Sequence, residues 1–363
     1  MLTETVWSGM AKTLGYGVRQ RTISGDRCTA KSLVATAYFD GLQTRVPSDG
    51  NRHPGAPPAL PTSETHRQHQ VRNSQILMNV VPILNSRAIL GECPVWRAAD
   101  RRLYWLDIFG QTLNCLNPTT ATNIQITLSE RVNSFAFRSG GGLVAACWNG
   151  FGTVDASSGN VDRFHDLRKT QPGFFLNDGR CDRRGRFWAG SACENFDVRE
   201  ATLFRLTADR TILEAAKGSL ISNGLAFSPD DKRAYYADTF EGVIWIYDFD
   251  LDDGVLSNRR EFARCPFPDG AAVDTLGRYW VACFGQSEVR CFTPSGVLDQ
   301  VIKLPTSQVT MCAFGGDSLD TLFITTGTFW LDPVAVKTQT LAGAVFAVTG
   351  LGAQGLPEPE FQD

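Results

Sequence analysis

The chain has 363 residues, a formal net charge of −3 and 43% hydrophobic residues, so it is long enough to bury a large core. Its 35 Lys and Arg residues are scattered, which argues against nucleic acid and anionic membranes as partners. It has neither an apolar span long enough for a membrane helix nor a secretory signal in its first thirty residues. We therefore expect a cytoplasmic protein.

The ten cysteines occur singly along the chain, without a C-x-x-C pair. Zinc ribbons and thioredoxin-type redox motifs are therefore not predicted. Because most of the cysteines lie inside apolar runs, we interpret them as small core residues of a protein in a reducing compartment.

Residues 1–77 differ in character from the rest of the chain. They are rich in Gln, Arg, Ser and Pro and show no sustained period of 2 or 3.6 residues, so we expect a disordered leader. Met78 stands where the periodic pattern begins. We hypothesise that the natural start is Met78 and that the leader is not part of the natural protein.

From Asn79 onward, short strands alternate with turns, and one layout recurs six times. A polar residue precedes a short apolar run, which is followed by a turn and an aromatic or aliphatic strand, as in residues 222–238. The leading polar residues, spaced 41 to 46 positions apart, are Glu92, Asn133, Asn177, Asn223, Asp269 and Thr310. This spacing is typical of propeller blades. We therefore predict an all-β, six-bladed β-propeller over residues 78–363, with no substantial helix.

The last blade is one strand short in this pattern, because its final recognisable strand covers residues 344–348. The apolar run at residues 80–84 precedes the first blade and has no sheet of its own. A propeller must close on itself to protect its sheet edges. We therefore predict that this N-terminal strand completes the sixth blade and closes the ring.

The innermost strands of a propeller line its central channel, so the six leading residues are expected to meet at one mouth. Glu92 and Asp269 would then face each other among amides, which is costly for two carboxylates unless a cation lies between them. Oxygen ligands favour Ca²⁺, Mg²⁺ or Mn²⁺, and Zn²⁺ also accepts carboxylates. The sequence predicts one divalent cation without deciding which.

A purely structural role is the competing interpretation for several of these polar residues. Asn and Asp before a strand often fix turns through hydrogen bonds to the backbone. Among the six leading residues, this structural interpretation applies most to Asn133 and Thr310. Asp178, Asp182 and Asp274 lie close to glycines, so we expect them to form turns rather than bind ligands. The structural interpretation is weaker for Glu92, because Glu has no special role in turns.

Covalent catalysis is not predicted. His165 is the only histidine after residue 77, and the chain has no G-x-S-x-G elbow or glycine-rich phosphate loop. A divalent cation can instead polarise an ester carbonyl and acidify water while a carboxylate takes the proton. The residues therefore suggest hydrolysis without a nucleophilic side chain.

The sequence resembles the SMP-30/gluconolactonase/regucalcin family of six-bladed propellers. The segments that carry the resemblance are residues 90–96 (LGECPVW), 103–108 (LYWLDI), 177–179 (NDG) through Gly190, 222–225 (SNGL) and 268–270 (PDG). The resemblance covers about residues 79–355.

The resemblance implies that Glu92, Asn223 and Asp269 are metal ligands and that Asp269 is the general base. Asn177 would contact the substrate or the metal's water, and Asn133 is a further candidate for substrate binding. The implied substrate is a small-molecule sugar lactone, such as a glucono-, xylono- or arabinonolactone, that is opened to the aldonic acid.

Two positions affect the expected substrate. Phe175 stands where sugar lactonases of the family often carry Arg, and Glu194 or Asn195 falls where they often carry an acidic residue that binds sugar hydroxyls. We therefore keep Phe175 and Glu194 as candidate substrate-binding residues. The alternatives to a sugar lactonase are a calcium-binding regulatory propeller without turnover and a hydrolase of a less polar ester.

Overall fold

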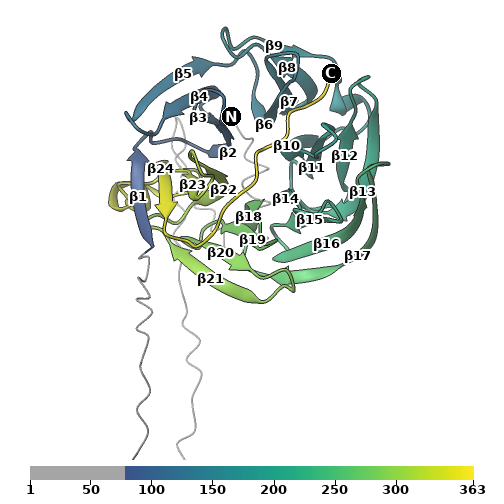
Figure 1. The fold of residues 1–363 in the computed structure, drawn as a ribbon. Helices are drawn as coiled ribbons and strands as arrows, with labels where there is room; N and C mark the ends of the chain where they lie inside the picture. The colour runs from purple at the N-terminus through teal and green to yellow at the C-terminus, as the bar shows by residue number, and fades with distance from the viewer. Residues whose placement is uncertain (1–77) are drawn as a thin grey trace, which may run out of the picture.

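A computed structural model of the protein describes residues 78–363, so the expected leader at residues 1–77 lies outside the described residues. The strands form six four-stranded antiparallel sheets, arranged as blades around a central axis (Figure 1). The prediction of an all-β, six-bladed propeller is confirmed.

Five blades follow the same order along the chain, with the innermost strand first. Blade 1 contains β2 (Gly91–Arg97), β3 (Arg102–Asp107), β4 (Thr112–Asn117) and β5 (Thr122–Thr127). Blade 2 contains β6 (Val132–Phe137), β7 (Leu143–Cys147), β8 (Gly150–Val154) and β9 (Val161–Arg163). Blade 3 contains β10 (Phe174–Cys181), β11 (Phe187–Cys193), β12 (Ala201–Leu206) and β13 (Ile212–Ser219).

Blades 4 and 5 repeat this pattern. Blade 4 contains β14 (Ser222–Phe227), β15 (Arg233–Asp238), β16 (Val243–Asp250) and β17 (Val255–Arg264). Blade 5 contains β18 (Pro268–Val273), β19 (Tyr279–Cys283), β20 (Glu288–Phe292) and β21 (Leu298–Lys303). Helical structure within residues 78–363 is limited to the 3₁₀ turn η1 (Leu167–Lys169) and the six-residue helix α2 (Pro333–Thr338).

Blade 6 combines both ends of the described chain. Its strands β22 (Val309–Gly315), β23 (Thr321–Thr326) and β24 (Val345–Thr349) are joined at the outer edge by β1 (Asn79–Leu84). β1 runs antiparallel to β24, with Asn79 opposite Thr349 and Pro82 opposite Phe346. The outer edge of this sheet is therefore built from residues that precede the first blade.

Tryptophans fill the space between neighbouring blades. Trp105, Trp188 and Trp280 are among the largest fully buried side chains, and each lies on the second strand of its blade. The indoles of Trp188 and Trp280 donate hydrogen bonds to Asp182 and Asp274. Burial of such large apolar side chains stabilises each blade interface by several kcal/mol, on the order of 2 to 3 for each ring.

The same two aspartates fix the turns after the inner strands of blades 3 and 5. Asp182 accepts hydrogen bonds from the backbone N–H groups of Arg184 and Arg186, and Asp274 does the same for Leu276 and Arg278. The prediction that Asp182 and Asp274 form turns is confirmed.

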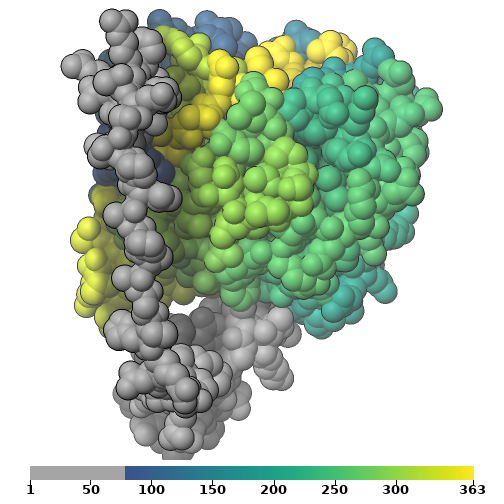
Figure 2. Space-filling view, turned by 60° about the horizontal axis from the view of Figure 1, so that its bottom comes forward, coloured from purple at the N-terminus to yellow at the C-terminus, as the bar shows by residue number. Residues whose placement is uncertain are grey.

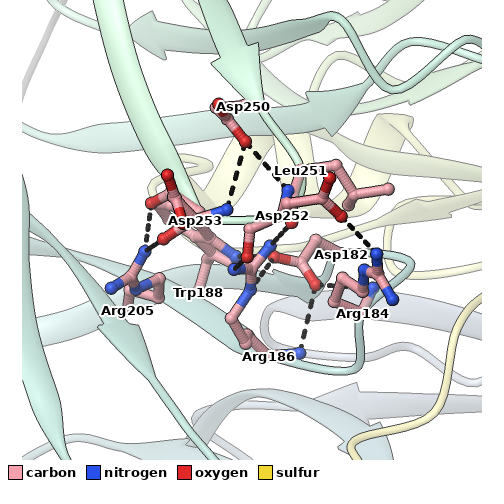
Figure 3. Close-up of polar contacts among 10 residues, drawn as sticks. Asp182, Arg184, Arg186, Trp188, Arg205, Asp250, Leu251, Asp252 and Asp253 are labelled. Atoms are coloured by element: carbon pink, nitrogen blue, oxygen red, sulfur yellow. Dashed lines mark hydrogen bonds and ion pairs between the residues drawn. The ribbon is translucent and has the colours of Figure 1, made fainter.

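Around Asp182 a network of charges ties blade 3 to blade 4 (Figure 3). Arg186 reaches from Asp182 to the carbonyl oxygen of Leu251, in the turn between β16 and β17. Arg184 pairs with Asp252 of the same turn. Each guanidinium in this network therefore has an oxygen partner.

The C-terminal segment, residues 350–363, crosses one mouth of the channel and is called the strap (yellow in Figures 1 and 2). It bonds to the turns that follow the inner strands: the N–H of Thr275 donates to Gln354, and the N–H of Gln362 donates to Gly185. Phe361 is buried beside the end of β6. We call this end the strapped mouth and the end where inner strands begin the site mouth.

All nine cysteines within residues 78–363 are buried and unpaired, as expected for core residues. Within the same part of the chain, no helix is long and apolar enough to cross a membrane.

Candidate functional site

The six inner strands share a distortion at the site mouth. In each of β2, β6, β10, β14, β18 and β22, the pairing register shifts beside the leading polar residue. Such bulges interrupt the ladder and change the direction in which a side chain leaves the strand. The repeated bulge is the local reason that polar side chains can enter an otherwise apolar inner strand.

Two carboxylates, Glu92 and Asp269, lie close enough that the charge of Glu92 acts on Asp269. Burial and the charge of Asp178 raise the pKa of Glu92 to about 8. Burial, followed by the charges of Glu92 and Asp178, raises the pKa of Asp269 well above its usual value. A carboxyl behaves this way when it lacks both water and a nearby cation. The predicted pair is therefore brought together and is electrostatically uncompensated.

Asp178 was expected to form a turn, and this expectation is wrong. It lies in the bulge of β10, where its carboxylate accepts a hydrogen bond from the N–H of Leu225 at 3.0 Å. Its neighbour Arg180 donates to the carbonyl oxygens of Leu225 and Ala271 and pairs with Glu358 of the strap at 3.3 Å.

This ion pair, buried on the Arg180 side, ties the inner strand β10 to the strap. Sequence reasoning missed it, although two charged residues inside a buried strand, Asp178 and Arg180, are themselves a signal of a special environment.

Asn177 and Asn223 are bonded to each other. The amide of Asn177 donates to Oδ1 of Asn223 and to the carbonyl oxygen of Ser222, both at 2.9 Å. The amide of Asn223 donates to Thr239 at 2.8 Å, and Thr239 donates to the carbonyl oxygen of Pro268 at 2.7 Å. These bonds link blades 3, 4 and 5 and fix the Asn223 side chain beside the strand that carries Asp269.

Gly224 allows β14 to pass close to blade 5. Its φ is +61°, and a Cβ atom there would lie 2.3 Å from the hydroxyl of Tyr279. Only glycine adopts this conformation without strain and leaves that space free.

Asn133 and Thr310 have different roles in the ring. The amide of Asn133 donates to the carbonyl oxygen of Leu176, but its Oδ1 is buried without a hydrogen-bond partner among the described residues. The hydroxyl of Thr310 bonds to Gly91 and Thr325. Thr310 is thus used by the fold, whereas Asn133 retains an acceptor that a ligand could satisfy.

The donor set fits a hard divalent cation. Glu92 and Asp269 supply carboxylate oxygens and Asn223 supplies an amide oxygen, which are the ligand types that such cations prefer. No group of three or more His, Cys, Asp or Glu within residues 78–363 is arranged to hold a metal ion. A cation at this mouth would therefore need the amide oxygen in addition to the two carboxylates.

Phe175 and Glu194 lie at the rim of the site mouth. The ring of Phe175 is 5% exposed and stacks in parallel on Trp148, with centroids 4.0 Å apart. Glu194 is exposed in the loop between β11 and β12, where its backbone N–H donates to Gly173. Phe175 therefore belongs to an aromatic cluster, and Glu194 lies outside the buried ring.

Aromatic side chains surround this mouth, and the sequence prediction did not include them. Each connection between the second and third strands of a blade carries at least one, and these residues are Phe109, Trp148, Phe196, Phe240, Phe284, Phe329 and Trp330. We call this set the aromatic collar. Its recurrence once per blade is the sequence signal that could have revealed it.

The family described as SMP-30/Gluconolactonase/LRE-like region matches residues 90–328. A 6-deoxy-6-sulfogluconolactonase of Pseudomonas putida is 37% identical over 283 residues, which cover 77% of this chain and 97% of that protein. Regucalcin of Oryctolagus cuniculus is 33% identical over 285 residues, covering 76% of this chain and 95% of the relative.

Among solved structures, a luciferin-regenerating enzyme superposes with a TM-score of 0.73 and 26% identity, covering 79% of this chain and all of the other. The match of fold, inner-strand motifs and most of the propeller's length agrees with the resemblance seen in the sequence. The chain belongs to the SMP-30/gluconolactonase family.

Proposed function

We propose that this protein hydrolyses a sugar lactone to its aldonic acid at the site mouth and that Glu92, Asn223 and Asp269 hold a divalent cation there. The observation that carries the proposal is the pair of carboxylates, Glu92 and Asp269, whose pKa values are raised by burial and by a neighbouring carboxylate, Asp178 for Glu92 and Glu92 for Asp269. Carboxylates so placed are costly to ionise unless a cation binds.

Asp269 is suited to act as the general base. It is a carboxylate within the proposed ligand set, so it can take the proton of a water that attacks the ester carbonyl. When bound, a divalent cation supplies positive charge that polarises the carbonyl and acidifies water.

Asn177 and Asn133 orient the lactone in this proposal. Asn177 is held against Asn223 by its amide, which keeps its side chain beside the ligand set. Asn133 offers its unpaired, buried Oδ1 to a substrate hydroxyl. Both side chains contribute hydrogen bonds that a sugar ring can use and a plain alkyl ester cannot.

The relatives support the predicted enzyme class, a lactonase. The Pseudomonas putida relative is named as a 6-deoxy-6-sulfogluconolactonase, and it is more similar to this chain than the regucalcin described above. The name regucalcin agrees with a divalent cation, without deciding between Ca²⁺ and other ions.

A pH-stat assay tests the proposal. The purified protein is given glucono-, xylono- and arabinonolactone and an aryl ester before chelation, after chelation, and after return of Ca²⁺, Mg²⁺, Mn²⁺ or Zn²⁺. We expect acid release from at least one lactone that disappears on chelation and returns with a cation. Release that survives chelation, or no release, would overturn the proposal. Tight Ca²⁺ binding without release from any substrate would instead support the regulatory alternative.

A further inference from the structure

One guanidinium at the site mouth lies over two aromatic rings. The Cζ atom of Arg131 lies 4.8 Å from the ring centroid of Phe109 and 4.6 Å from that of Trp148. Trp148 in turn stacks on Phe175, which precedes Asn177 by two residues on β10. The stack therefore runs from blade 1 to blade 3 at the rim of the site.

The aromatic collar continues on both sides of this stack. Phe175 contacts Phe196, which contacts Phe240. In the other direction, Phe109 contacts Phe329, and Trp330 contacts Phe284. These contacts place Arg131 within a row of aromatic side chains that runs along the rim from Phe284 to Phe240.

The guanidinium of Arg131 forms no ion pair or hydrogen bond with any of the residues 78–363. Partial burial lowers its pKa, and no described carboxylate opposes that effect. The guanidinium carbon lies over the rings of Phe109 and Trp148, and the N–H donors at the edge of the guanidinium have no partner among residues 78–363. An edge of parallel N–H donors is the geometry that binds two oxygens of one anionic group.

Arg131 also lies close to the candidate ligands along the chain. It precedes Asn133 by two residues, just before β6 begins at the site mouth. Asn133 in turn bonds to the residue before Asn177. A substrate held at Asn133 and Asn177 would therefore extend toward Arg131 if it carried a substituent on that side.

We propose that Arg131 recognises an anionic substituent of the substrate, so that the preferred lactone carries a carboxylate, sulfonate or phosphate group away from its ester bond. The aromatic collar holds the guanidinium in place and buries it in part, which strengthens its attraction to an anion. This proposal rests on the lactonase function proposed above and makes Arg131 a specificity residue rather than part of the hydrolytic machinery.

The test compares gluconolactones that differ only at carbon 6, where they carry a hydroxyl, a carboxylate, a sulfonate or a phosphate group. The variant Arg131→Met retains the length of the side chain and removes the charge. Arg131→Lys retains the charge but lacks the planar guanidinium with its paired N–H donors. Arg259→Met is the matched control, since Arg259 stacks on Trp245 at 4.8 Å in the outer part of blade 4.

We expect the wild type to prefer at least one anionic lactone over the neutral one. Arg131→Met should lower kcat/KM for that lactone by about 10- to 100-fold, the value of a hydrogen-bonded charge. It should change kcat/KM for the neutral lactone by no more than about twofold. Arg131→Lys should have a kcat/KM for the anionic lactone between those of the wild type and Arg131→Met. Arg259→Met should leave kcat/KM for both lactones unchanged. Comparison of the three anionic groups identifies the preferred one. An equal loss on all lactones would mean that Arg131 only supports the collar, and would overturn the proposal.

Binding of non-hydrolysable probes separates this proposal from the proposed function. The probes are 1,5-anhydro sugars with the same four groups at carbon 6, which lack the ester carbonyl, and binding is measured by calorimetry. Even if no lactone is hydrolysed, we expect an anionic probe to bind about 10-fold or more tightly than the neutral one, and Arg131→Met to remove that difference. Equal binding of neutral and anionic probes would overturn the role of Arg131.

Discussion

The two mouths of the channel differ in how their charges are compensated. At the strapped mouth, Asp182 and Asp274 are fully buried, yet each accepts hydrogen bonds from backbone N–H groups, an arginine and a tryptophan. At the site mouth, Glu92 accepts one hydrogen bond, from the backbone N–H of Cys93, but neither Glu92 nor Asp269 pairs with an arginine or a tryptophan among residues 78–363, and burial raises the pKa of both. The same residue types therefore stabilise the fold at one end and remain available for a ligand at the other.

Burial of a carboxylate therefore does not by itself identify a ligand-binding site. A buried carboxylate with hydrogen-bond and ion-pair partners contributes to stability. Without such partners, its ionisation costs free energy, and a bound cation can offset that cost. Arg180 lies on β10 between the two mouths and pairs with Glu358 of the strap.

The largest expected effect comes from exchanging one carboxylate at each mouth. Asp269→Asn removes the proposed base and a metal ligand, so we expect lactonase kcat/KM to fall by about 10²- to 10⁴-fold with little change in folding. Asp274→Asn breaks a buried ion pair and should lower the free energy of unfolding by about 3–5 kcal/mol.

Asp274→Asn should nevertheless leave kcat/KM of the folded fraction nearly unchanged. Rates on a responsive lactone and urea unfolding of both variants check this contrast. If the two substitutions had the same profile, the distinction between the mouths would be lost.

Removal of the outer strand of blade 6 is expected to affect the whole ring. Deletion of residues 79–86 removes β1, leaves β24 as an exposed edge and should lower the melting temperature strongly. A variant that begins at Met78 is the control and should melt like the full chain. Calorimetric melting curves of the three proteins provide the measurement, and an unchanged midpoint for the deletion would argue against closure by this strand.

The strap should stabilise the fold without affecting the chemistry. Phe361 is buried against blades 2 and 3, so Phe361→Ala should lower the free energy of unfolding by about 3–5 kcal/mol. Leu276→Ala is the control because Leu276 is 66% exposed at the same mouth and should change stability by less than about 0.5 kcal/mol. Urea denaturation measures both values. A loss of kcat/KM in folded Phe361→Ala would show that the strapped mouth contributes to catalysis.

The smallest expected effect is a pH dependence of the chelated protein. The pKa of Glu92 rises from 4.5 to about 8 on folding, so between these values the folded state binds more protons than the unfolded state. Stability should therefore fall as pH rises through this window, on the order of 1–2 kcal/mol for a partly exposed group. Glu92→Gln should flatten part of the slope, and a saturating cation should remove it. Urea midpoints from pH 5 to 8.5 measure the effect, and a rise in stability over this window would contradict it.

Much of the fold could be predicted because its signal is local and repeated. Each blade carries its own polar leader, turn and aromatic strand, so six copies specify six sheets even though no single copy would. The candidate ligands followed from the same repeat, since equivalent positions in successive inner strands must meet around one axis.

The remaining features depend on contacts that the repeat does not encode. Asp178 and Asp182 look alike in the sequence, but a bulge carries Asp178 into the channel while Asp182 stays in a turn. The strap has no counterpart in the blades, and its pairing with Arg180 joins positions far apart in the chain. The stack around Arg131 depends on side chains from neighbouring blades, which only the closed ring brings together.

Calorimetric titration of the chelated protein with Ca²⁺, Mg²⁺, Mn²⁺ and Zn²⁺ tests the central claim most directly. The wild type and Asp274→Asn should bind one equivalent of at least one cation with similar affinity. Asp269→Asn should lose that binding, and Glu92→Gln should weaken it strongly. Binding that persists unchanged in both Asp269→Asn and Glu92→Gln, or no binding to the wild type, would contradict the assignment of these carboxylates to a cation site.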